Sequence, residues 1–147
     1  MRRIYYDSLM AKTLLAKDFD TSMLFGTICT KHAETDPLSE RVKRHESIHC
    51  EQYWEMTVAA FLVAVVLQIV FDGGWWFVAV PFVYYAIYFL EAAITWAIRL
   101  CTHGWREAFD RAYTNSMFEQ EARDWESVPG YVESRPLWAV LHYFGRI

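Results

Sequence analysis

Two long apolar stretches dominate the pattern of hydrophobic and polar positions along the chain. The first carries no charge from Met56 to Phe71, and Tyr53 extends it to roughly the 20 residues that a helix needs to cross a membrane. The break "DGG" at 72–74 separates it from a second stretch over 75–99. This pattern predicts an integral membrane protein that is mainly α-helical, with the two stretches forming a transmembrane helical hairpin.

The flanking segments predict smaller elements. The run "SMLFGTICT" at 22–30 is typical of a short edge strand, and proline and serine signals predict a helix over 38–71 that continues into the first span. A further helix is expected over 105–127, followed by an aromatic-rich tail over 136–147 that suits a membrane interface. No linker-like composition interrupts the chain, so we expect one domain, 1–147.

Composition and charge limit the classes of partner and site that we expect. The chain is 54% apolar and 18% aromatic, with a formal net charge of -4 and no basic patch, so we expect no nucleic-acid partner. Three widely spaced cysteines, Cys29, Cys50 and Cys101, make neither a disulfide framework nor a paired-cysteine zinc site. The N-terminus lacks the apolar core of a signal peptide, so we do not expect export.

The distribution of basic residues predicts the orientation in the membrane. Eight Lys and Arg lie in 1–55, six lie in 99–147, and the turn between the spans has none. By the positive-inside rule, both termini should face the cytoplasm across the inner membrane. Glu91 and Gln68 fall inside the spans, where a carboxylate is a functional candidate, although Glu91 could instead pair with Arg99 or face the partner helix. The alternative to a membrane hairpin is a soluble bundle that buries both helices.

A histidine pair lies just before the first span. His45 and His49 are four residues apart, so on a helix their side chains project from one face about one turn apart, as two ligands of one zinc ion do. Glu46 points about 100° away from His45, where it could act as a general base on a metal-bound water. The spacing therefore predicts a hydrolytic metal site at the membrane surface.

The motif "HESIH" at 45–49 resembles the HExxH helix of the zincin metallopeptidases, and this resemblance implies a third metal ligand. Metzincins continue with a glycine and a histidine where this chain has Gln52 and Glu55, so that branch is excluded. The chain is more similar to gluzincins, distantly to the membrane-embedded HtpX-type and CAAX-type proteases with their E-x-x-A-D pattern. The segment "EQEAR" at 119–123 matches its glutamate and alanine, but Arg123 replaces the aspartate.

The chain also resembles small membrane proteins that combine an HExxHxxQ helix, a membrane hairpin and a later F-E-x-E-A stretch, here "HESIHCEQ" and "FEQEA". His49 precedes the first span and Glu119 follows the second, so both lie on one side of the membrane. Glu121 is the competing third ligand, but it points roughly 200° away from Glu119 on a helix. We favour Glu119 because Ala122, on its face, permits close helix packing.

The function implied is a membrane-bound zinc-dependent peptidase in which His45, His49 and Glu119 hold Zn²⁺. Glu46 would take a proton from the zinc-bound water and pass it to the leaving amine. The expected partners are a peptide or protein substrate, pairing with the strand at 22–30, and the lipid bilayer. The oligomeric state stays open.

Two supporting roles are also predicted. The oxyanion of the tetrahedral intermediate needs a hydrogen-bond donor. Tyr113 is the best placed in the sequence, and His103 and His142 are alternatives. Gln52 follows on the histidine face and could support a ligand or serve helix packing.

Two other functions compete with the peptidase. Glu46 and His49 also spell the E-x-x-H pair of a di-iron site, but the chain has no second such pair. The non-enzymatic alternative is a membrane interaction module with a structural metal site, which the missing aspartate at Arg123 favours. The presence of Glu46 argues against it, because a structural site needs no base at that position.

Overall fold

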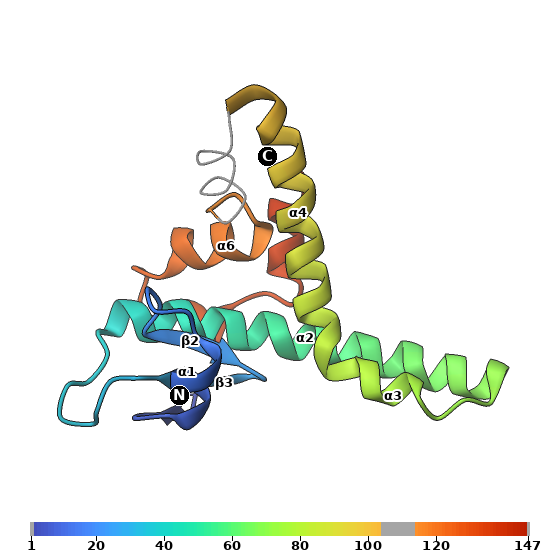
Figure 1. Ribbon diagram of the computed structural model, residues 1–147, viewed down its shortest axis with the longest axis horizontal. Coiled ribbons are helices and arrows are strands. Elements are labelled where there is room, and N and C mark those ends of the chain that lie inside the picture. The colour runs from blue at the N-terminus through green and yellow to red at the C-terminus, as the bar shows by residue number, and fades with distance from the viewer. Residues whose placement is uncertain (1, 104–113, 147) are drawn as a thin grey trace. The chain divides into compact units, whose positions relative to one another are not determined.

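The structure is a computed structural model that describes residues 2–103 and 114–146, and it is mainly helical with one small sheet near the N-terminus (Figure 1). By its contacts the chain divides into two units. The first comprises Met1–Tyr53 and Ala122–Arg135, and the second comprises Trp54–Glu121 and Pro136–Ile147. The single domain expected from the sequence therefore stays a prediction, and each unit is described by itself.

The sheet of the first unit has three short strands in the order β1-β3-β2. They are β1 (Ile4–Tyr5), β2 (Thr21–Leu24) and β3 (Thr27–Thr30), with β1 parallel and β2 antiparallel to β3. Phe25 and Gly26 form the turn between β2 and β3, with φ of 49° and 75°, the left-handed backbone that suits tight hairpins. Where the sequence predicts one strand over 22–30, the structure thus has two, because this turn reverses the chain.

The N-terminal segment also contains a short helix, α1 (Leu9–Leu14), capped by Ser8. The Ser8 hydroxyl accepts a hydrogen bond from the Ala11 N–H at 3.5 Å. Neither β1 nor α1 is among the elements predicted from the sequence.

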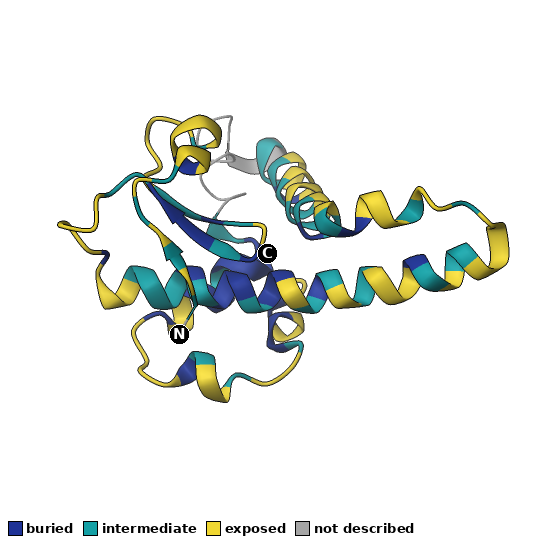
Figure 2. Cartoon of the chain, turned by 90° about the horizontal axis from the view of Figure 1, so that it is seen from below, coloured by how far each residue is buried: buried dark blue, intermediate teal, exposed yellow. Residues whose placement is uncertain are grey.

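Helix α2 (Glu40–Phe71) is a single helix of 32 residues that carries the HExxH motif and continues into the first apolar stretch. Ser39 caps its start, since its hydroxyl accepts the Val42 N–H at 3.3 Å. Its end is marked by Asp72, whose φ is 47° and whose carboxylate accepts a hydrogen bond from the Gln68 side chain at 3.2 Å. Figure 2 shows α2 changing along its length, from many buried residues around the motif to a largely exposed end.

A small hydrophobic core fixes the motif within the first unit. Ile48 of α2 packs with Ala122 and Tyr131, and the first two are fully buried. Ala122 belongs to α6 (Met117–Trp125), and Tyr131 begins α7 (Tyr131–Ser134). The Trp125 ring stacks on Tyr131 at 4.3 Å between centroids. The C-terminal half of α6 is therefore held against the HExxH segment of α2.

The second unit begins with the apolar end of α2 and continues through α3 (Trp76–Ala79), the 3-10 turn η1 (Val80–Phe82) and α4 (Val83–His103). Short helix α3 folds back on α2, with the Phe61 and Phe77 rings 5.7 Å apart. Pro81 lies inside the predicted span 75–99, and there the α-helix is interrupted because proline has no N–H to donate.

Two helical segments are long and apolar enough to cross a membrane, Glu40–Phe71 and Trp76–Leu100. Only 11% of the most apolar window of each is buried. A soluble bundle would need these windows buried, so their exposed apolar surface favours a lipid environment. Integration into a membrane and the hairpin across it stay predictions.

The last predicted elements are described in part. Within the helix expected over 105–127, the described portion forms α6, and 104–113 lie outside the described residues. The tail expected over 136–147 contains the 3-10 helix η2 (Ala139–Tyr143) and exposes large apolar side chains, among them Leu137 and Phe144.

Candidate metal centre

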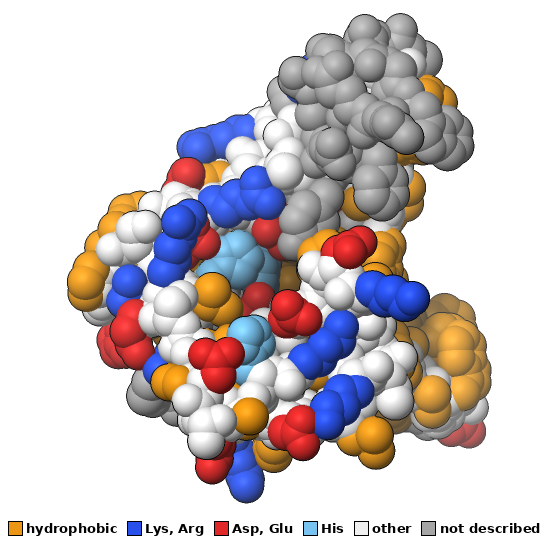
Figure 3. All heavy atoms as spheres, turned by 60° about the vertical axis from the view of Figure 1, so that its left-hand side comes forward, with side chains coloured by type: hydrophobic (Ala, Val, Ile, Leu, Met, Phe, Trp, Pro, Cys, Tyr) orange, Lys and Arg blue, Asp and Glu red, His pale blue; other side chains and the backbone are white. Residues whose placement is uncertain are grey.

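The two histidines of the motif converge on one point beside α2. Their ring centroids are 4.8 Å apart, and the Nε2 atoms of His45 and His49 are 3.1 Å apart. The i, i+4 spacing predicted from the sequence therefore places both rings on one face of the helix, as expected. The His45 side chain keeps 17% of its surface exposed, and Figure 3 shows histidine side chains within a face of mixed acidic and basic groups.

The other ring nitrogens are held by oxygen acceptors. His45 Nδ1 lies 2.9 Å from Glu126 Oε2, and His49 Nδ1 lies 2.8 Å from Gln52 Oε1. With Glu126 Oε2 and Gln52 Oε1 as acceptors, each Nδ1 carries the proton, and the Nε2 lone pairs of two neutral rings then face one another. Two lone pairs at this distance repel unless a proton or a metal ion lies beside them. Gln52, for which the sequence leaves open a supporting role or a role in helix packing, thus contacts His49, and its support of a metal ligand stays a prediction.

Glu126 is a site residue that the sequence analysis missed. Its Oε1 accepts a hydrogen bond from Arg41 Nε at 2.7 Å, and its backbone oxygen accepts one from Arg44 Nε at 2.6 Å. Its own N–H donates to Ala122 O at 2.8 Å, so the residue continues the helical turn. Its position could have been found from the helical spacing, because residues 119, 122 and 126 lie on one face of a helix. The E-x-x-A-D pattern places its aspartate at position 123 instead, where this chain has Arg123.

Glu46, the predicted general base, is buried and contacts the sheet. Its Oε2 accepts a hydrogen bond from the Met23 backbone N–H at 2.6 Å. In an antiparallel pair a residue's N–H and C=O point to the same side, so this bond marks the outer edge of β2. The glutamate is thus fixed beside an edge strand, close to where the sequence analysis expected an extended substrate.

The predicted third ligand, Glu119, belongs to the second unit, and its meeting with the two histidines stays a prediction. Glu119 is buried, and its Oε1 accepts a hydrogen bond from the Tyr88 hydroxyl at 3.2 Å. It lies one turn before Ala122 on the continuous helix α6. Glu121 is also fully buried but points to a different side of α6.

The predicted oxyanion donors receive no support from the described residues. Tyr113 lies outside the described residues, as does the side chain of His103. The His142 Nδ1 lies 3.1 Å from the carbonyl oxygen of Ala139, a local contact within η2. The hydroxyl beside Glu119 comes from Tyr88, which the sequence does not distinguish from the other tyrosines of an apolar helix.

Cys50, next to His49, is a free and fully buried cysteine. Burial raises the pKa of its thiol to about 12, so it is protonated near neutral pH. On α2, position 50 lies roughly 100° around the helix from His49 and roughly 140° from His45, so the thiol is not on the face of the histidine pair.

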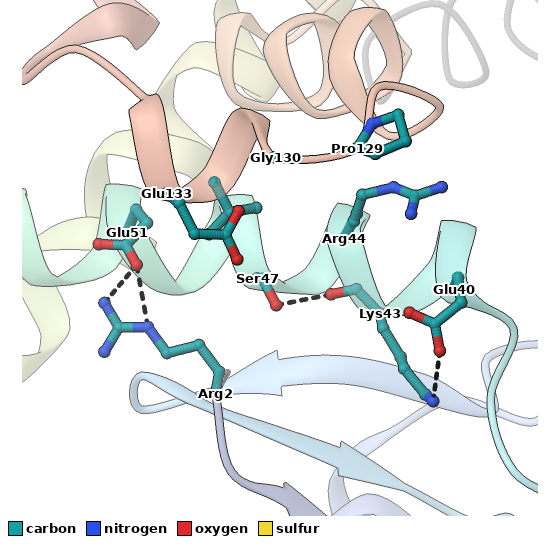
Figure 4. A pocket seen from close by; sticks show the side chains of 10 residues that line it. Arg2, Glu40, Lys43, Arg44, Ser47, Glu51, Pro129, Gly130 and Glu133 are labelled. Carbon is teal, nitrogen blue, oxygen red and sulfur yellow. Dashed lines mark hydrogen bonds and ion pairs between the residues drawn. The ribbon is translucent and has the colours of Figure 1, made fainter.

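A surface pocket of about 530 Å³ lies on another face of α2 (Figure 4). Its walls carry three basic and three acidic side chains, from Arg2, Lys43, Arg44, Glu40, Glu51 and Glu133. Two ion pairs occupy its ends, Arg2 with Glu51 and Lys43 with Glu40. On α2, Ser47 of this pocket lies roughly 200° around the helix from His45 and from His49. The pocket is therefore separate from the histidine pair.

Comparison of the chain with protein-family models, with curated proteins and with solved structures gives no match. The geometry of these side chains is therefore the basis on which a function can be inferred.

Proposed function

We propose that this chain is a membrane-bound, zinc-dependent peptidase. The observation that carries the proposal is the opposed pair of Nε2 atoms of His45 and His49, 3.1 Å apart, each on a ring whose Nδ1 is held by an oxygen acceptor. Histidine ligands of metals usually donate their second ring N–H to such an acceptor. With zinc–nitrogen bonds of about 2.0–2.1 Å and tetrahedral angles, two ligand nitrogens lie roughly 3.3 Å apart. The observed separation fits this requirement.

Glu119 is our proposed third ligand. Its face of α6 also carries Ala122, which packs on Ile48, and leads to Glu126, which contacts His45. This arrangement favours Glu119 over Glu121, since the latter points elsewhere on the helix. Two imidazoles and one carboxylate would leave the fourth position open, as catalytic zinc sites do.

Glu46 is our proposed general base. Zinc, when bound, supplies a Lewis acid and lowers the pKa of a coordinated water to about 7. The carboxylate of Glu46 would accept a proton from the attacking water and pass it to the leaving amine. Its bond to the Met23 N–H keeps the carboxylate beside the outer edge of β2. An extended peptide pairing with that edge would bring its backbone to the base with little choice of sequence.

The exposed apolar segments argue for action at a membrane. Their surfaces suit lipid, and basic residues flank both of them. We propose that the chain is integrated in the inner membrane, with both termini and the histidine pair on the cytoplasmic side. Its substrates would then be peptides or proteins on that side.

A non-catalytic membrane interaction module with a structural metal site is the second candidate. It is favoured by the hydrogen bond between Glu46 and the Met23 N–H, because a carboxylate held in this way can serve the fold alone. The chain also has Arg123 where the HtpX-type and CAAX-type proteases have an aspartate, and this difference favours the interaction module.

Glu46→Gln separates the two functions. For the peptidase, the purified protein should hold about one zinc per chain, and the variant should keep that zinc but lose about 10²–10⁴-fold in cleavage of an unstructured peptide. Zinc content by elemental analysis and cleavage by mass spectrometry give the two values. Glu40→Gln is the matched control, since Glu40 is exposed and pairs with Lys43 on the pocket side of α2.

Full cleavage by Glu46→Gln would refute the mechanism. Zinc binding without cleavage in the unmutated protein, together with a co-purifying partner, would favour the interaction module. Zinc content that is unchanged in His49→Ala would refute the proposed metal centre itself.

A further inference from the structure

A carboxylate lies in the middle of the second apolar segment, where a charge is costly. Glu91 belongs to α4, inside the segment Trp76–Leu100 that is long and apolar enough to cross a membrane. Ionisable groups at such positions need a partner and are functional candidates. The sequence leaves open whether this glutamate pairs with Arg99, faces a neighbouring helix or has a chemical role.

The structure shows that Glu91 binds the start of α6. Its Oε1 accepts the Met117 N–H at 2.8 Å, and its Oε2 accepts the Ser116 hydroxyl at 2.9 Å. Ser116 in turn accepts the Phe118 N–H at 3.3 Å, so it acts as the N-cap. The first N–H groups of a helix have no partner within it, and a negative charge there is favourable. Glu91 therefore fixes the end of the helix that carries Glu119.

A second contact comes from the same face of α4. Tyr88 lies one turn before Glu91, and its hydroxyl donates to Glu119 Oε1 at 3.2 Å. Its ring lies 5.8 Å from that of Phe118, which is fully buried and also packs on Tyr84 at 5.0 Å. α4 thus holds both the first turn of α6 and the carboxylate of Glu119.

We infer that Glu91 and Tyr88 are positioning residues for the metal ligand Glu119, so that the second apolar helix is part of the metal centre. This inference rests on the proposed function, because it takes Glu119 as a ligand. Glu91 orients α6 through its first turn, and Tyr88 orients the carboxylate itself. The hydrogen bonds from Ser116 and Met117 stabilise the charge of Glu91 within the apolar segment.

Glu91→Gln tests the inference in detergent-solubilised full-length protein. An amide retains the volume but loses the charge and one acceptor, so we expect zinc affinity to fall about 10–100-fold in competition with a chromophoric chelator. The visible absorption bands of the Co²⁺-substituted protein should also change, because they report ligand geometry. Glu55→Gln is the matched control, since Glu55 Oε1 accepts a hydrogen bond from another backbone segment of the same unit, the Trp138 N–H at 2.8 Å.

Tyr88→Phe keeps the ring beside Phe118 and removes only the hydroxyl, so it tests the inference if Glu91→Gln fails to fold. We expect about a tenfold loss of zinc affinity, the usual effect of a hydrogen bond to a charged group. Unchanged affinity and Co²⁺ bands in Tyr88→Phe, or in a folded Glu91→Gln, would overturn the inference while the proposed function stands. If the unmutated protein binds neither metal, both fail.

Discussion

At the scale of single residues, the tautomers of two histidines decide what the site can bind. His45 donates from Nδ1 to Glu126, and His49 donates from Nδ1 to Gln52. The two Nε2 atoms then lie opposite one another, 3.1 Å apart. Glu126 contributes most to this arrangement, because its carboxylate also binds Arg41 and is itself buried.

We predict that Glu126→Gln lowers zinc affinity about 10–100-fold, since a neutral amide orients His45 less well and makes it a weaker base. Chelator competition on the purified protein measures the change. Glu40→Gln, an exposed glutamate that binds Lys43, should leave the affinity unaltered. Equal affinities in the two variants would mean that Glu126 serves only to hold Arg41.

Part of this site could be predicted from the sequence. His45, Glu46 and His49 follow from helical spacing alone, because contacts one turn apart are local. Glu126 also lies on the helix face of Glu119, but nothing local shows that its partner is a histidine 81 residues away. Tyr88 is one of nine tyrosines, and only the packing of α4 on α6 distinguishes it.

At the scale of elements, the long helices were predictable and the short ones were not. The helix expected over 38–71 is observed as Glu40–Phe71, since a capped start and a long uninterrupted run are strong signals. β1 has two residues and exists because it pairs with β3, far along the chain. The second span, expected as one helix over 75–99, is interrupted at Pro81, which has no N–H to donate to the preceding turn.

The packing of α6 on α2 gives a stability prediction. Ala122 is fully buried against Ile48 and Tyr131, so Ala122→Leu should overpack this core and destabilise the fold by about 1–3 kcal/mol. Thermal unfolding followed by circular dichroism measures the effect. Asp124→Leu, on the exposed side of α6, should shift the midpoint much less. Similar shifts would show that this face of α6 is not packed.

At the scale of the whole molecule, the charge distribution and the exposed apolar segments support one topology. Basic residues occur on both sides of the apolar region and are absent from the turn at 72–74. The proposed metal centre takes ligands from the segment before the first span and from the segment after the second. Both segments must therefore lie on the same side of the membrane. Membrane topology is therefore a condition of the function.

We predict that a cysteine in the turn is labelled from outside intact cells, whereas one near the N-terminus is labelled only after permeabilisation. Gly74→Cys suits the turn, because an added Cβ there meets no atom within 4 Å, and Leu9→Cys suits the N-terminus, where the side chain is 74% exposed. A membrane-impermeant maleimide is the probe, in a Cys101→Ser background. The remaining native cysteines, Cys29 and Cys50, are buried and should stay silent. Labelling of both positions from the same side would rule out the transmembrane hairpin.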